Sequence, residues 1–101
     1  MKDQNQVAAT ILKQLGGNKF LAMTGAKYLV AGANFLQFTI PGRKINSVVI
    51  RLDPNDTYTL LFNKKTNMGV DIKNVAKATG VYADRLQSIF TENTGLYTSL
   101  L

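Results

Sequence analysis

Three short segments in the middle of the chain alternate apolar with polar residues, and turn-forming residues separate them. Side chains of a strand point alternately to its two faces, so each segment has one apolar face when it is extended. The connections contain Pro41-Gly42 and Asp53-Pro54-Asn55, which favour turns and are too short for a crossover. Neighbouring strands must therefore run antiparallel, as a β-meander. The three segments are residues 35–40, 47–52 and 57–63.

The apolar face of this sheet needs a cover, and both ends of the chain have helical patterns. Residues 3–15 place their apolar side chains on one stripe of a helix, which Gly16-Gly17 ends. Asp71 is an N-cap residue for a second helical pattern, which breaks at Gly80 and resumes over residues 83–91. A chain of 101 residues is one domain, 1–101. We therefore predict an α+β domain: an N-terminal helix, an antiparallel meander of three to five strands, and C-terminal helical segments packed on one sheet face.

The stretch 16–32 contains four glycines and resembles a phosphate-binding loop at first sight. A P-loop requires G-x-x-x-x-G-K-[ST] between a strand and a helix, but Gly25 is followed by Ala26, Lys27 and Tyr28. The aromatic and branched residues after Lys27 favour a strand. We therefore predict extended segments at 19–24 and 27–31, with the glycines allowing the turns between them.

The distribution of charge indicates a partner. The net charge of the chain is +6, and residues 19–65 hold seven lysine or arginine residues against two aspartates. A basic surface favours polyanions: nucleic acid, an acidic protein or an anionic membrane face. In a meander, the turn after one strand and the end of the strand two later lie at the same edge, so Arg43-Lys44 should lie beside Lys64-Lys65. The predicted nucleic-acid-binding residues are Arg43, Lys44, Lys64, Lys65, Arg51 and Lys27.

The segment around Gly80 has two interpretations. An alanine four residues before a turn glycine, with apolar residues after it, is typical of a helix-turn-helix unit, in which Arg85 and Gln87 would read base edges. The alternative is a helical hairpin that covers the sheet. Residues 66–101 contain three basic and three acidic side chains, and this zero net charge favours the cover. Both interpretations bury Leu86.

The residue types present do not favour catalysis. The chain contains no histidine and no cysteine, which removes the commonest general base near neutral pH and any thiolate metal site. Asp53 and Asp56 flank Pro54 in a turn, where aspartate is favoured for local hydrogen bonding. We predict a protein that is not an enzyme and uses neither a metal nor a cofactor. Its apolar runs are too short to span a membrane and it has no leader pattern, so we expect it in the cytoplasm and not in a membrane.

Two blocks, "LGGNKFLAMTGAK" and "GVYADRLQSIFTENTGLYTSL", resemble segments of a family of small uncharacterised proteins of bacteriophages, prophages and related mobile elements. The likeness extends from about Leu15 to Leu100. It implies a bacterial cytoplasm during infection or lysogeny and no assigned enzyme activity, and it supplies no functional residues. Two classes of function stay open: a nucleic-acid-binding accessory protein, and an interaction protein that binds and modulates a host protein such as a defence complex or a polymerase.

Overall fold

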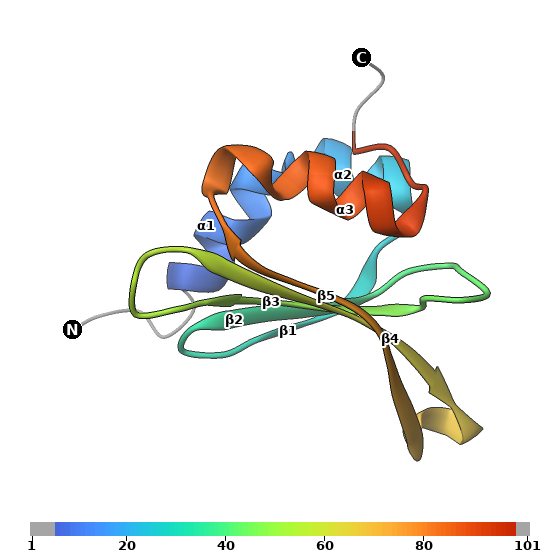
Figure 1. The fold of residues 1–101 in the computed structure, drawn as a ribbon. Coiled ribbons are helices and arrows are strands. Elements are labelled where there is room, and N and C mark those ends of the chain that lie inside the picture. The colour runs from blue at the N-terminus through green and yellow to red at the C-terminus, as the bar shows by residue number, and fades with distance from the viewer. Residues whose placement is uncertain (1–5, 99–101) are drawn as a thin grey trace.

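A computed structural model describes residues 6–98, apart from the side chain of Asn67. Within this range five antiparallel strands form a sheet in the order β1-β2-β3-β4-β5, and helices lie over one of its faces (Figure 1). The predicted α+β meander is confirmed. The strands are β1 (Lys27–Ala31), β2 (Phe35–Thr39), β3 (Ser47–Leu52), β4 (Tyr58–Thr66) and β5 (Asp71–Val81). The helices are α1 (Gln6–Leu15), α2 (Asn18–Thr24) and α3 (Leu86–Thr94), and two 3₁₀ turns are η1 (Asn67–Gly69) and η2 (Ala83–Arg85).

The core lies between the helices and the predicted apolar face of the sheet. Phe38 of β2 pairs with Val48 of β3, which pairs with Phe62 of β4, and all three are fully buried. Phe20 of α2 packs edge-on against Phe38 with ring centroids 5.3 Å apart, and against Phe90 of α3 at 5.2 Å. Three aromatic rings therefore join both ends of the chain to the sheet. Residues 3–5 of the predicted first helix lie outside the described residues, and α1 confirms the remainder of that helix.

The predicted extended segment at 19–24 is wrong, because these residues form the helix α2. The amide N–H of Gly17 donates to the carbonyl of Leu12 and ends α1, and Gly25, with φ at 71°, ends α2. Phe20 and Thr24 are four residues apart and both buried, which is the helical period. Leucine, alanine and methionine in this segment are good helix formers. Gly17 therefore ends the first helix, as predicted, but a second helix follows it in place of the expected extended segment. Gly25 ends that helix, where we expected a turn between two extended segments.

The predicted helix beginning at Asp71 is also wrong, and so are both interpretations built on it, the helix-turn-helix unit and the helical hairpin. The predicted helical segment at 83–91 is confirmed by η2 and α3. Residues 71–81 form β5, which pairs with β4 along its whole length. Ala76 and Ala78 lie opposite Phe62 and Leu60, so these alanines fill the core face of an edge strand. Gly80, with φ at 64°, lies at a β-bulge where the register of the pair shifts. Two such shifts hide the two-residue alternation by which we recognised the other strands.

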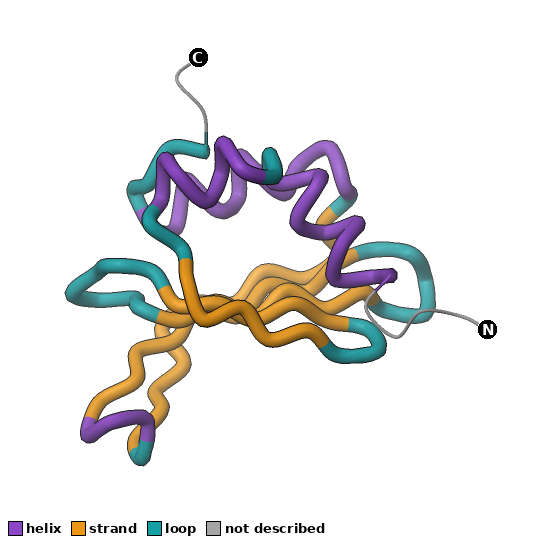
Figure 2. Tube along the Cα trace, turned by 180° about the vertical axis from the view of Figure 1, so that it is seen from behind, coloured by secondary structure: helices purple, strands orange, loops and turns teal. Residues whose placement is uncertain are grey.

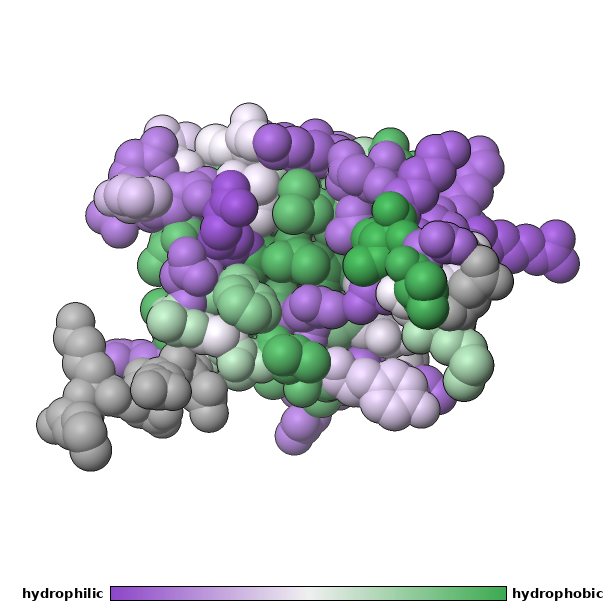
Figure 3. All heavy atoms as spheres, turned by 90° about the horizontal axis from the view of Figure 1, so that it is seen from below, coloured by the Kyte–Doolittle hydropathy of each residue, from purple (hydrophilic) through white to green (hydrophobic). Residues whose placement is uncertain are grey.

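The sheet also extends further than predicted. We expected residues 64–69 to end it, but β4 and β5 continue past the last paired residue of β3, Ser47 opposite Asn63. Residues 64–73, called the ribbon below, form a two-stranded extension that projects from the sheet on the side away from the helices (Figure 2). The opposite face of the sheet carries no helix in the described part of the chain (Figures 1 and 2). Figure 3 shows this open face, with apolar side chains near its centre and hydrophilic ones around them.

None of the helices within residues 6–98 is long and apolar enough to cross a lipid bilayer.

Candidate nucleic-acid interface

The loop between β2 and β3 is tied to β4 at the root of the ribbon. The side-chain amide of Asn46 donates to the backbone carbonyl of Lys65 at 2.9 Å, and the amide N–H of Lys65 donates to Asn46 Oδ1 at 2.8 Å. Nearby, Lys64 Nζ donates to the carbonyl oxygen of Gly42 at 3.4 Å. These contacts place Lys64 and Lys65 beside the loop that carries Arg43 and Lys44. The meander geometry predicted this arrangement.

Glycine is required in this loop. A Cβ at Gly42 would lie 2.0 Å from the backbone carbonyl oxygen of Ile45, so a side chain there would displace the turn. Ile45 is buried and anchors the end of the loop in the core. Arg43 and Lys44 between them are exposed. The loop is therefore anchored at both ends, and it presents the two cationic side chains to solvent.

Two more cations reach the same end of the sheet. Lys73 of β5 pairs directly with Lys64, because residues 71–81 form a strand. Lys27 of β1 pairs with Thr39, in the row that continues through Ser47 to Asn63, next to Lys64. Lys73 is not among the predicted residues, because the sequence pattern around it predicts a helix. Among the described residues the set called the basic end below is Lys27, Arg43, Lys44, Lys64, Lys65 and Lys73.

The acidic residues lie elsewhere, with one exception. Of those that the structure describes, Asp71 pairs with Thr66 in the ribbon. Asp53 and Asp56 lie in the turn at the opposite end of β3, and the remaining two, Asp84 and Glu92, belong to η2 and α3 in the helical layer. Like charges directly opposite each other in a sheet are destabilising, as Lys64 and Lys73 are. A bound anion would relieve that repulsion.

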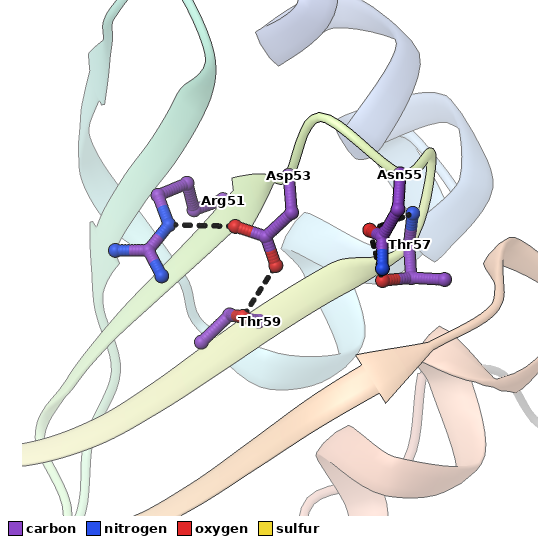
Figure 4. A network of polar contacts seen from close by, with 5 residues as sticks. All are labelled: Arg51, Asp53, Asn55, Thr57 and Thr59. Atoms are coloured by element: carbon purple, nitrogen blue, oxygen red, sulfur yellow. Dashed lines mark hydrogen bonds and ion pairs between the residues drawn. The ribbon is translucent and has the colours of Figure 1, made fainter.

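Arg51 does not belong to the basic end. It lies at the far end of β3, where its Nε donates to Asp53 Oδ1 at 3.0 Å (Figure 4). Thr59 Oγ1 donates to the other carboxylate oxygen of Asp53 at 2.6 Å. Asn55 Oδ1 accepts from the hydroxyl of Thr57 at 2.7 Å in the same turn. These side chains therefore stabilise the turn after β3, and the Asp53 carboxylate accepts hydrogen bonds from Arg51 and Thr59.

The hydrogen bond from Thr59, and next the one from Arg51, hold the pKa of Asp53 below its usual range. A carboxyl whose pKa is lower in the folded state stabilises the fold above its unfolded pKa, and this contribution disappears as the pH falls through the folded pKa. We expect the urea midpoint to fall as the pH drops below about 5, and to fall less in Asp53→Asn. Thr59→Val, which removes the first donor, should reduce the pH dependence in the same way. An Asp53→Asn variant with an unchanged pH profile would contradict this assignment.

The predicted base-reading residues serve the helical layer. Gln87 Nε2 donates to the backbone carbonyl of Gln14 at 3.1 Å and so ties α3 to α1. Leu86 is fully buried, and Arg85 is exposed on η2. With the preceding residues in a strand, no first helix exists to support a recognition helix. Arg85 and Gln87 are therefore not brought to the basic end.

A hollow of about 450 Å³ lies at the basic end of the open face. Its wall includes Tyr28, which is 76% exposed and has a left-handed backbone with φ at 57°. This conformation costs a bulky residue roughly 1–2 kcal/mol, and it occurs where the register of β1 against β2 shifts. In contrast, Tyr58 is buried in the core. The residues that line the hollow are Tyr28, Thr39, Asn46, Lys65, Met68 and Gly69.

Comparison of the chain with protein-family models, with curated proteins and with solved structures gives no match. The geometry of the basic end therefore carries the functional argument.

Proposed function

We propose that the protein is a nucleic-acid-binding accessory protein of a phage or mobile element, acting in the bacterial cytoplasm through the basic end of its sheet. The observation that carries this proposal is the convergence of the loop at Arg43-Lys44 with the ribbon at Lys64, Lys65 and Lys73. These cations come from three separate segments of the chain.

Electrostatics supports a polyanionic partner. The basic end holds six cationic side chains against Asp71 in the part of the chain that the structure describes. Phosphate groups along a nucleic-acid backbone match several cations from neighbouring segments, because each cation neutralises one phosphate and releases a condensed counterion. A single small anion would neutralise only part of this charge and leave the other cations repelling one another.

Binding through phosphates predicts a steep dependence on salt. With four to six contacts, the logarithm of the binding constant should fall against the logarithm of salt concentration with a slope of about −3 to −5. Fluorescence anisotropy with labelled single-stranded and double-stranded oligonucleotides, from about 50 to 300 mM salt, measures this slope. If neither strand form binds at the lowest salt, the proposal is wrong.

Exposed apolar side chains on the ribbon support a second candidate, in which the protein binds and modulates a host protein. Met68 is fully exposed, and Val70 and Ile72 are exposed beside it. Apolar side chains gathered on a projecting element are typical of a surface that binds a protein. Recovery of one host protein in a pull-down, weakened by Met68→Ser and Val70→Ser but not by Lys64→Ala, would support this candidate over the first.

A further inference from the structure

We propose that the hollow at the basic end binds single-stranded nucleic acid, with a base stacked on the ring of Tyr28. This inference rests on the proposed function and names the form of nucleic acid. It comes from the conformation of Tyr28, from the residues that line the hollow, and from the charges around it.

Tyr28 is an aromatic residue in a backbone conformation that favours glycine. Its φ is 57°, at a bulge in an edge strand, and its side chain is not packed into the core. Residues with strained backbone conformations cluster at active sites and ligand-binding sites. Here the side chain is a ring held in solvent at the mouth of the hollow. An exposed ring offers a π-face on which any base can stack.

The hollow has the size and chemistry for a nucleotide unit. Its volume of about 450 Å³ lies within the usual range for a small-molecule site. Tyr28 lies on β1, while Met68 and Gly69 lie on the ribbon, so aromatic and apolar groups line the hollow from two elements. Asn46 and Thr39 supply polar groups. Such a lining suits a flat ring with polar edges.

The charge near the hollow favours the phosphates of a bound strand. Lys65 lines the hollow, and Lys27 precedes Tyr28 in β1. We expect these two lysines to contact backbone phosphates of a strand whose base enters the hollow. The remaining cations of the basic end continue the track onto the loop and the outer side of the ribbon.

A single strand satisfies this geometry better than a duplex. The bases of a duplex are stacked on one another, and exposing one of them costs a few kcal/mol in unpairing and unstacking. A single strand presents its bases freely, and sequence-tolerant binding then combines stacking with a positively charged groove. We therefore expect oligothymidylate and oligouridylate to bind more tightly than a duplex of the same length.

The test compares Tyr28→Gly and Tyr28→Phe with the unmodified protein, using oligothymidylate of about 12 nucleotides. Glycine relieves the left-handed strain, so the unfolding temperature of Tyr28→Gly should be unchanged or higher. The affinity of this variant for the oligonucleotide should fall about 5- to 150-fold, with the salt slope retained. Phenylalanine keeps the π-face and should bind like tyrosine. The chain has no tryptophan, so its emission comes from tyrosine. Binding should quench this emission in the unmodified protein and less so in Tyr28→Phe.

Further probes separate failure of this inference from failure of the proposed function. An abasic strand of the same length should bind the unmodified protein about as weakly as oligothymidylate binds Tyr28→Gly. Should Tyr28→Gly bind oligothymidylate as tightly as the unmodified protein, with salt-dependent binding intact, the stacking site is overturned and the proposed function stands. A duplex that binds as tightly as the single strand overturns the strand preference. If neither strand form binds at low salt, the proposed function fails and this inference fails with it.

Discussion

Replacing Phe20 with alanine is expected to lower the free energy of unfolding by about 3–5 kcal/mol, a large part of the stability of a domain this size. The Phe20 ring is fully buried and packs edge-on against both Phe38 and Phe90. Its removal leaves a cavity at the point where α2 and α3 meet the sheet, and it removes two aromatic pairs as well as buried area. Urea denaturation gives the change from the midpoint and the slope.

The matched control is Met23→Ala on the same helix. Met23 lies at the exposed side of α2, so its truncation should change the unfolding free energy by less than about 1 kcal/mol. The helix has seven residues, and an isolated helix of that length is not stable in water, so α2 depends on its packing. A loss below about 1 kcal/mol for Phe20→Ala with an unchanged slope would contradict the central place given to this ring.

The predicted strands and the buried face of the sheet follow from sequence because their pattern is strictly local. Leu36 and Phe38 of β2, like Val48 and Ile50 of β3, alternate with less apolar residues and are all buried. Turns containing proline and glycine mark the boundaries. Alternation and turn chemistry agree there, and where local signals agree a sequence determines its fold clearly.

The two wrong assignments come from segments where local signals conflict. In β5, Asp71 as an N-cap residue and the alanine before Gly80 favour a helix. However, β4 offers a long unpaired edge, and Ile72 and Val75 are branched residues that suit a strand. The bulge at Gly80 removes the alternation that would have identified the strand. In such segments pairing with a neighbouring strand overrides propensity.

The candidate site was predictable only in part. The juxtaposition of Arg43-Lys44 with Lys64-Lys65 required nothing beyond meander connectivity. To place Lys73 at the site, one must know that residues 71–81 form β5. To predict that Tyr28 is exposed, one must know of the bulge in β1, which no local pattern reveals. Arg51 was assigned by charge alone, and the structure gives it Asp53 as a partner. The distribution of charge along the sequence locates a basic region, while the pairing of strands determines which basic side chains lie close together.

Removing the basic end should remove most of the salt dependence of binding. In a variant in which the four predicted cluster residues become alanine, four phosphate contacts are lost, and each contributes about 0.7 to the slope on a single strand. The slope should therefore flatten by roughly 2–3 units. Relative to a 1 M reference, four contacts account for a factor of roughly 10³–10⁴ in the binding constant at about 50 mM salt. The four substitutions are Arg43→Ala, Lys44→Ala, Lys64→Ala and Lys65→Ala.

The control must lose the same charge from other parts of the molecule. The control replaces Lys13 on α1, Lys19 on α2 and Arg85 on η2. It also replaces Arg51, which forms an ion pair with Asp53. Because none of these side chains belongs to the basic end, the control should keep the slope of the unmodified protein apart from the weak effect of net charge. Relief of the repulsion between Lys64 and Lys73 should leave the test variant at least as stable as the control. Equal weakening in both variants would mean that net charge alone drives binding, and the basic end would lose its place as the site. The control substitutions are Lys13→Ala, Lys19→Ala, Arg51→Ala and Arg85→Ala.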